Sequence, residues 1–293
     1  MKDSQSPWFL FVQRFRKHTM ALVGMVILVS ITILVAFAPF FTTHDPMQQN
    51  LLNRFQPPSA THWLGTDDLG RDLWARILYG GRISLSVGLL AMAVSITLGS
   101  LIGLLAGYFG GWVDSVLMRT TEIFLSIPRL FVLIALGMFL RSLDLSMFQA
   151  GSFIPIALVI GLLSWMGTAR MVRASTLTVR EREYVQACRA LGGSHRRILL
   201  RHILPNIASP IIVSATLGLS GAIISESGLS YLGFGVQLPT PTWGNMLSNT
   251  QSQITTAPWA AIFPGFMIFL VVISINYIGD GLRDALDPRH HSR

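Results

Sequence analysis

The sequence predicts an all-α membrane protein with six transmembrane helices and with both termini on the inner side of the membrane. The first observation is composition: 51% of the 293 residues are hydrophobic and 12% are charged, and the mean hydropathy is +0.55. Soluble domains carry about 25% charged residues, so this composition is typical of a polytopic membrane protein. The other two observations are apolar runs of bilayer length and the uneven placement of basic residues around them.

The first predicted span, Met20–Phe40, is an apolar run of 21 residues. A helix of this length measures roughly 31 Å, which matches the hydrocarbon core of a bilayer. A secretory signal peptide is the alternative, because basic residues precede the run. The run is too long for that, and Ala38-Pro39-Phe40 is a poor cleavage site, so we expect an anchor that stays in the protein.

Hydropathy predicts five further spans. They are Ile83–Phe109, Phe124–Leu140, Phe153–Gly167, Ile207–Ser225 and Trp259–Ile278. Pro128 and Arg129 interrupt the third span at its inner end, where an arginine side chain can extend to the interface.

The basic residues orient these spans, because lysine and arginine near span ends stay on the cytoplasmic side. With the N-terminus inside, 17 of the 22 basic residues fall in inner segments and 5 in outer ones. The predicted division is a cytoplasmic segment 1–19, a first transmembrane helix 20–40, an external segment 41–82, a five-helix core 83–279 containing a cytoplasmic loop 168–206, and a cytoplasmic tail 280–293. Topology thus explains the net charge of +8, and no nucleic-acid partner is expected.

Several kinds of chemistry are not expected of this chain. Cys188 is its one cysteine, which excludes a disulfide framework, and no cysteine–histidine cluster has zinc-ligand spacing. The pattern Gly-x-x-x-x-Gly-Lys-Ser/Thr of a phosphate-binding loop is missing from the sequence. We therefore expect no catalytic residues, no metal and no cofactor in this chain, and energy must come through a partner.

Charged side chains at mid-membrane depth mark proton or ion relays. Arg119 and Glu122 stand three residues apart at the predicted inner end of the third span, while Asp144 and Glu226 fall near outer ends. We interpret these residues as helix-end charges rather than as a relay.

The cytoplasmic loop contains a segment suited to a protein partner. Its first part, Thr168–Arg182, continues the fourth span as a helix with its arginines facing water, and small residues follow. Gly192-Gly193 breaks the helix, and Ser194 is a suitable N-cap for a returning helix His195–Ile203. On the intervening short helix, one face holds Tyr184, Ala187, Cys188 and Leu191. The alternative is an ordinary interfacial basic loop, which does not explain the small residues.

This segment resembles the EAA loop of ABC importer permeases. The family pattern is Glu-Ala-Ala, three residues, Gly, nine residues, then Ile-x-Leu-Pro, and Gln186 and His202 are the departures from it. The resemblance implies that the segment inserts into a groove of the ATPase subunit and transmits its movement. The implied coupling residues are Glu183, Tyr184, Gln186, Ala187, Cys188, Arg189, Ala190, Leu191, Gly192, Gly193 and Ser194.

Two outer stretches resemble the second permease subunit of peptide and nickel importers: Trp63–Leu73, and Glu226–Gly235 with its continuation to Asn245. In the first, Asp68 is predicted to cap a helix whose Arg71, Asp72 and Arg76 face water. This first stretch either forms a surface that closes the outer gate or contacts a binding protein, or it is a helix at the membrane interface. The second lines an outer vestibule, forms a re-entrant turn, or is a packed surface loop. Residues assigned to an outer gate or to docking are Asp68, Gly70, Arg71, Asp72, Glu226, Tyr231 and Trp243.

The resemblance also implies the type I ABC importer permease fold, in a multi-pass protein of the bacterial inner membrane. The implied partners are a homologous permease subunit, two ATPase subunits that bind ATP and magnesium, an extracytoplasmic solute-binding protein and the lipid bilayer. The implied cargo is a dipeptide or oligopeptide, with nickel chelates, glutathione and sugars as alternatives. Two other functions remain as alternatives. A secondary transporter would need acidic residues at mid-membrane depth and paired broken helices, and a membrane-embedded enzyme would need convergent catalytic groups. We do not find these patterns in the sequence.

Overall fold

The computed structural model describes residues 7–142, 151–248, 250 and 253–286. Its elements in chain order are α1 (Pro7–Lys17), α2 (Thr19–Ala36), α3 (Ala38–Phe41), η1 (Leu51–Asn53), α4 (Leu73–Phe109), α5 (Gly111–Ser126), α6 (Arg129–Ser142), α7 (Ile154–Leu162), α8 (Trp165–Arg180), α9 (Glu183–Ala190), α10 (His195–Arg197), η3 (Ile198–Ile203), η4 (Leu204–Ile207), α11 (Ala208–Tyr231), α12 (Trp243–Ser248) and α13 (Trp259–Leu286). Asp144, and the basic residues Lys2, Arg289 and Arg293 of the orientation count, lie outside the described residues.

The described residues contain between four and six candidate membrane spans. Helices α2, α4 and α13 are long and apolar enough to cross a bilayer, as is the continuous helical stretch from α10 to the end of α11. Two further pairs, α5 with α6 and α7 with α8, meet the same criterion together, although each pair is bent. The total reaches the predicted six if each bent pair is counted as one span.

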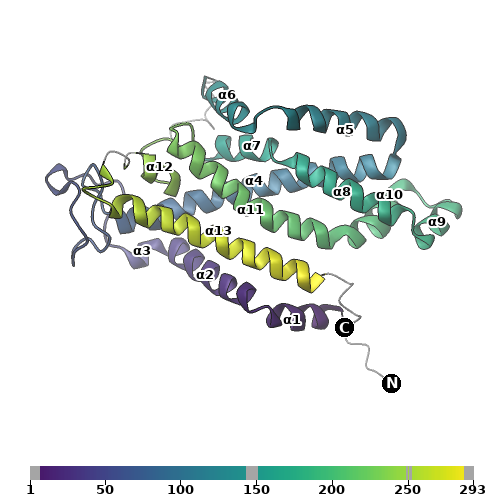
Figure 1. The fold of residues 1–293 in the computed structure, drawn as a ribbon, viewed down its shortest axis with the longest axis horizontal. Helices are drawn as coiled ribbons and strands as arrows, with labels where there is room; N and C mark the ends of the chain where they lie inside the picture. The colour runs from purple at the N-terminus through teal and green to yellow at the C-terminus, as the bar shows by residue number, and fades with distance from the viewer. Residues whose placement is uncertain (1–6, 143–150, 249, 251–252, 287–293) are drawn as a thin grey trace.

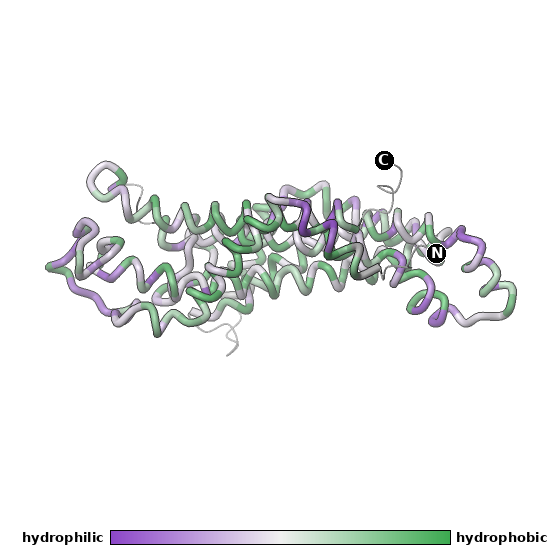
Figure 2. The backbone as a smooth tube through the Cα atoms, turned by 90° about the horizontal axis from the view of Figure 1, so that it is seen from below, coloured by the Kyte–Doolittle hydropathy of each residue, from purple (hydrophilic) through white to green (hydrophobic). Residues whose placement is uncertain are grey.

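The long helices lie along one axis of an elongated molecule (Figure 1). The segment between α3 and α4 lies at one end, and α9 lies at the other, toward which α1 and the last turns of α13 also point. Hydrophobic residues predominate along the middle, while hydrophilic stretches gather mainly toward the two ends (Figure 2). This distribution is the one that a bilayer around the middle of the bundle requires.

Helices α4 and α8 approach each other closely because glycines line the contact. Gly99, Gly103 and Gly107 recur every fourth residue on α4, so they share one face of the helix. A Cβ at Gly99 would stand 2.6 Å from Cβ of Thr168, and one at Gly107 would stand 2.7 Å from Cβ of Thr176. Small residues at such positions let membrane helices pack backbone against backbone.

A second core joins α2, α11 and α13. Ile31, Ile223 and Ile275 are buried there together with Trp243 of α12. Gly24 of α2 lies against the backbone of α13, where a Cβ would stand 2.7 Å from the carbonyl oxygen of Ser274. Helix α2 therefore packs on the bundle.

The prediction of a single straight third span is wrong. Instead of one helix over Phe124–Leu140, α5 begins at Gly111, and α5 and α6 meet at an angle of 90°. Pro128 explains the bend, because a proline disfavours helical backbone in the residue before it, and Ile127 is extended. Arg129 consequently lies beyond the far end of α5 rather than at an inner end.

The start of the second span is also different from the prediction. Helix α4 begins at Leu73, and its N-cap is Asp72, whose Oδ1 accepts a hydrogen bond from Ala75 N at 2.8 Å. The prediction that Asp68 caps this helix is therefore wrong. The apolar stripe predicted beyond the cap is confirmed, since Leu73, Ile77 and Leu78 are buried.

Candidate functional site

Helix α9 and the turn after it form a projection at one end of the molecule (Figure 1). Gly192 adopts φ +78°, a left-handed conformation that glycine accepts without strain, and the chain reverses there. Ser194 is the N-cap of α10, with Oγ accepting from Arg197 N at 3.4 Å. The predicted glycine turn and serine cap are both confirmed.

The inner face of α9 anchors this projection to the bundle. Val185 is fully buried in a cluster with Ile198 and Ile203, and Cys188 packs partly against the same cluster. Gly193 permits this packing, because a Cβ there would stand 2.6 Å from Cys188 Sγ. Cys188, predicted to share the outer face with its neighbours, therefore turns partly inward.

The exposed surface of α9 and of Leu191, the residue after it, combines apolar and small side chains with polar and charged ones. Leu191 is 88% exposed and Tyr184 is 45% exposed. The other predicted coupling residues that are exposed are Glu183, Gln186, Ala187, Arg189, Ala190, Gly192 and Ser194. Apolar side chains and small residues exposed on one face suit a protein partner, which can approach the helix closely.

Direct contacts tie the projection to the end of α4. The hydroxyl of Tyr108 lies 2.7 Å from His195 Nδ1, and the guanidinium of Arg189 lies 5.3 Å from the centre of the Tyr108 ring. Arg180 Nη1 donates to the carbonyl oxygens of Gly107 and Tyr108 at 3.0 and 3.3 Å. Arg180 was predicted to face water, but it closes the end of α4 instead. The projection is therefore in direct contact with the end of α4.

A cavity of about 1030 Å³ opens between α4, α8 and α11. Small or hydroxyl-bearing residues alternate on its walls with larger apolar side chains such as Met92, Met171 and Leu217. The small or hydroxyl-bearing residues include Ser95, Gly167, Thr168, Ser209, Ser214, Gly218 and Gly221. Arg129 also lines the cavity and donates from Nη2 to Ser164 Oγ at 2.7 Å, while Arg283 lies on its wall. The cavity is large enough for a small solute, and its walls offer hydroxyl groups and positive charge.

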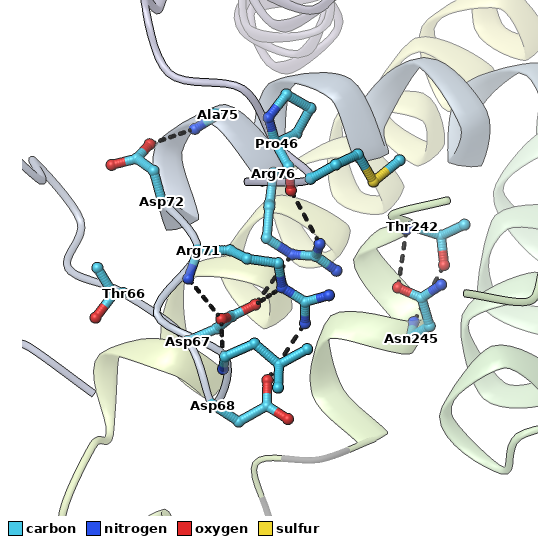
Figure 3. Close-up of polar contacts among 12 residues, drawn as sticks. Pro46, Thr66, Asp67, Asp68, Arg71, Asp72, Ala75, Arg76, Thr242 and Asn245 are labelled. Atoms are coloured by element: carbon cyan, nitrogen blue, oxygen red, sulfur yellow. Dashed lines mark hydrogen bonds and ion pairs between the residues drawn. The ribbon is translucent and has the colours of Figure 1, made fainter. Parts of the chain in front are cut away.

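At the opposite end, a buried ion network organises the segment before α4 (Figure 3). Arg71 Nε donates to Asp67 Oδ2 at 2.6 Å, and Arg76 Nε lies 3.3 Å from the same oxygen. Arg76 Nη1 also donates to Pro46 O at 3.2 Å. Arg71, Asp72 and Arg76 are therefore buried, and the prediction that they face water is wrong.

Glu226 is fully buried where α11 meets α4. It accepts hydrogen bonds from Ser84 at 3.1 Å and from Ser230 at 2.6 Å. Trp243 joins the same junction, since its backbone N–H donates to Ser84 Oγ and its Nε1 donates to Ile77 O at 3.0 Å. The interpretation of Glu226 as an ordinary helix-end charge is therefore wrong: this carboxyl group holds two helices together.

The residues assigned to an outer gate thus fall into two groups. Asp68 is half-buried and bonds Arg71, while Tyr231 is half-buried at the end of α11. Gly70, Arg71, Asp72, Glu226 and Trp243 are buried. Sequence reasoning gave Ser84 no role and placed Arg76 in water. The hydrogen bonds of Ser84 to Glu226 and of Arg76 to Pro46 join residues 142 and 30 positions apart in the chain. Asn245, also missed, bonds Thr242, Thr240 and Val236 and so holds its own segment in shape. The near balance of acids and arginines between residues 67 and 76 is a signal that pointed to internal pairing.

Comparison with known proteins gives two family matches. The model of the binding-protein-dependent transport system inner membrane component matches residues 99–292, and that of the N-terminal TM domain of oligopeptide transport permease C matches residues 6–58. The chain is 42% identical to the dipeptide transport system permease protein DppC of Alkalihalophilus pseudofirmus, over 98% of this chain and 91% of the relative.

Other relatives cover the chain equally well. The oligopeptide transport system permease protein OppC of Bacillus subtilis is 39% identical over 98% of this chain and 92% of its own. The glutathione transport system permease protein GsiD of Pectobacterium atrosepticum is 37% identical over 98% and 93%.

Two solved structures share the fold. The MetNI methionine ABC transporter, in inward-facing conformations, has a TM-score of 0.58 at 18% identity and covers 72% of this chain and 96% of its own. An amino acid ABC transporter has a TM-score of 0.51 at 18% identity, over 70% and 91%. This chain therefore belongs to the inner-membrane permease components of binding-protein-dependent transport systems, as an integral multi-pass membrane protein.

Proposed function

We propose that this chain is one permease subunit of an ATP-driven importer of dipeptides or oligopeptides. The relatives named for dipeptide and oligopeptide transport match it over nearly its whole length, which supports this cargo. Glutathione, the cargo named for a third relative, is itself a peptide. Nickel chelates and sugars are the less favoured alternatives.

The observation that carries the proposal is the outer face of α9. A leucine that is 88% exposed, beside a half-exposed tyrosine and three small residues, leaves apolar surface without a covering element of this chain. In the proposed assembly, a groove of an ATPase subunit covers this face. Two such ATPase subunits bind ATP and magnesium, and this chain contributes no catalytic group.

Contacts within the chain supply a route from α9 to the membrane helices. Movement of the projection acts on α4 through Tyr108 and on α8 through the short connection at Glu181-Arg182. The cavity between α4, α8 and α11 then forms one half of the solute path. A homologous permease subunit provides the other half, and rigid-body movement of the two halves opens the path alternately to each side.

The other end of the molecule receives the solute in this proposal. The buried ion network holds the segment before α4 in one shape, which suits a surface on which an extracytoplasmic solute-binding protein docks. With α9 toward the ATPases, both termini lie on the cytoplasmic side and the bundle has six spans.

Leu191→Asp tests the coupling role in the reconstituted four-subunit complex. Leu191 is almost fully exposed, so the change leaves the packing of this chain intact while placing a charge in an apolar contact. Peptide uptake and co-purification of the ATPase subunits should both fall at least about tenfold, as expected for a buried unpaired charge at an interface.

Leu52→Asp is the matched control, because Leu52 is 94% exposed at the opposite end. It should leave ATPase association unchanged. Normal association and uptake in Leu191→Asp would show that α9 is not the coupling element. Competition of labelled dipeptide uptake by oligopeptide, glutathione, nickel chelate and sugar identifies the cargo independently of that result.

A further inference from the structure

Three metal-ligating side chains meet in the segment that joins α3 to α4. They are His44 and His62, both half-buried, and Asp72, which is buried. One ligand atom from each lies within 4.8 Å of the ligand atoms of the other two. The positions are 18 and 10 residues apart, which is no short zinc-binding spacing, so the sequence pattern alone did not reveal them.

Hydrogen bonds of Asp72 to the backbone of α4 and to His62 hold the cluster in place. Asp72 Oδ1 caps α4 through Ala75 N at 2.8 Å, which leaves Oδ2 to face His62 Nδ1 at 2.8 Å. The His44 ring lies beside the His62 ring, with centres 5.0 Å apart. The carboxylate therefore has a fixed position on a rigid helix, and the two imidazoles converge on it.

Space for an ion and its water ligands adjoins the cluster on two sides. A cavity of about 210 Å³ is lined by His44, His62 and Asp72 together with the oxygen-bearing side chains of Asp45, Gln48, Asn50 and Asn53. A second cavity of about 370 Å³ also reaches His44 and Asp72. An ion can therefore approach from solvent, and water can complete its coordination.

We propose that His44, His62 and Asp72 bind a first-row divalent metal ion of the Zn²⁺ class. Two imidazoles and a carboxylate with room for water form a typical zinc ligand set. Tetrahedral zinc at about 2.0–2.1 Å from nitrogen or oxygen separates its ligands by roughly 3.3 Å, so small side-chain rotations suffice. Hard cations such as Mg²⁺ and Ca²⁺ prefer all-oxygen sites and are disfavoured here.

Binding links the end of α3 to the first turn of α4. His44 is the third residue after α3, and Asp72 caps α4, so the ion ties together both ends of the intervening segment. The ion takes the place of the hydrogen bond between His62 and Asp72, and a neutral His62 keeps its one N–H proton on the ring nitrogen that does not bind the ion. The site therefore stabilises the segment without any redox or group-transfer chemistry.

Zn²⁺ titration of the purified full-length chain against a chromophoric chelator tests the site. All variants carry His290→Ala and His291→Ala, so that these two histidines cannot contribute metal ligands. We expect one Zn²⁺ per chain, and His44→Ala should weaken binding at least tenfold, since even second-shell changes cost about 10- to 100-fold. Excess Mg²⁺ should not compete. Co²⁺ in the same site should give the intense visible absorption of a low-coordinate ion.

His202→Ala is the control, because His202 lies in η3 at the other end of the molecule and should leave affinity unchanged. His44→Ala leaves the Asp72 cap in place, so folding is preserved, and thermal unfolding checks this: Zn²⁺ should raise the Tm of the background chain but not that of His44→Ala. Equal Zn²⁺ affinity in the two, or no stoichiometric binding in the background chain, would overturn the proposal and leave the cluster as a hydrogen-bonded helix cap.

Discussion

Asp114 of α5 and Arg173 of α8 form a two-pronged ion pair. Arg173 Nη2 donates to Asp114 Oδ2 at 2.6 Å, and its Nε donates to the other carboxylate oxygen. Arg173 was predicted to face water as part of a basic loop, but the pair instead fastens α5 to the bundle. The geometry is specific to arginine, because a lysine cannot make two parallel bonds.

Arg173→Lys should therefore destabilise the chain while keeping its charge. We expect a loss of about 1 kcal/mol, typical of one hydrogen bond to a partly exposed charged group. Thermal unfolding in detergent measures the change, and Arg170→Lys, at an exposed position of the same helix, is the control. Equal Tm values for the two variants would mean that the pair does not fasten α5.

Gly70→Ala should disrupt the segment before α4. Gly70 adopts φ +71°, and a Cβ there would overlap the carbonyl oxygen of Asn50. The cost should be at least about 2 kcal/mol, from left-handed backbone plus overpacking. Limited proteolysis and Tm report the damage. Gly111→Ala separates backbone strain from overpacking, because Gly111 has φ +50° but open space around it. Its destabilisation should therefore be about 1 kcal/mol, typical of left-handed backbone alone.

Glu226→Gln should retain transport and most of the stability. Glutamine keeps an acceptor for Ser230, and the hydroxyl of Ser84 can rotate to accept from the new amide. Glu226→Leu should cost about 1–3 kcal/mol, because it leaves buried hydroxyls without their acceptor. Loss of transport in Glu226→Gln at unchanged Tm would instead indicate a proton relay at this carboxyl group.

Gly192→Glu should abolish coupling to ATPase subunits. The position is open in this chain, so added atoms collide with a partner rather than with neighbouring residues. Gly192→Asn is the control for backbone strain, because asparagine tolerates φ near +78° better than other residues do. Peptide uptake by the assembled complex is the measurement, and it should be lost in Gly192→Glu but retained in Gly192→Asn. Equal defects in both variants would attribute the effect to the turn and not to the groove.

The proposed topology predicts that Leu191 is cytoplasmic and Leu52 external. Single cysteines at these two highly exposed positions, in a Cys188→Ser background, serve as probes. An impermeant thiol reagent applied to sealed cells should label Leu52→Cys at once and Leu191→Cys only after permeabilisation. The reverse pattern would invert the orientation of the whole bundle.

Hydropathy predicted the positions of the apolar, membrane-spanning helices, but it did not predict all of their ends. Helices α2, α11 and α13 begin within one residue of the predicted starts at Met20, Ile207 and Trp259. Their ends differ more, because α11 continues past Ser225 to Tyr231 and α13 continues past Ile278 to Leu286. The first turns of α4 were predicted as a separate outer helix rather than as part of the span, because Arg76 and its neighbours lower the hydropathy there. Their burial depends on Asp67 and Pro46, which reach them only through tertiary folding.

The turn after α9 was more predictable than the outer end, because local chemistry determines it. A glycine pair and a serine cap define the turn after α9 whatever surrounds them. The Glu226 junction instead requires Ser84, which is 142 residues away in the chain. Neither helical periodicity nor composition predicts which distant segment completes such a junction.

The glycine face of α4 has a mechanical consequence. Thr168 and Thr176 of α8 fit over Gly99 and Gly107 with almost no gap, so neither helix can rotate about its axis without collision. The two helices therefore form one rigid unit, and the ion pair between Asp114 and Arg173 attaches α5 to that unit. We therefore expect α4 and α8 to move as one unit, and we expect any relative movement to occur at the 43° bend between α7 and α8 or at the contact with α11.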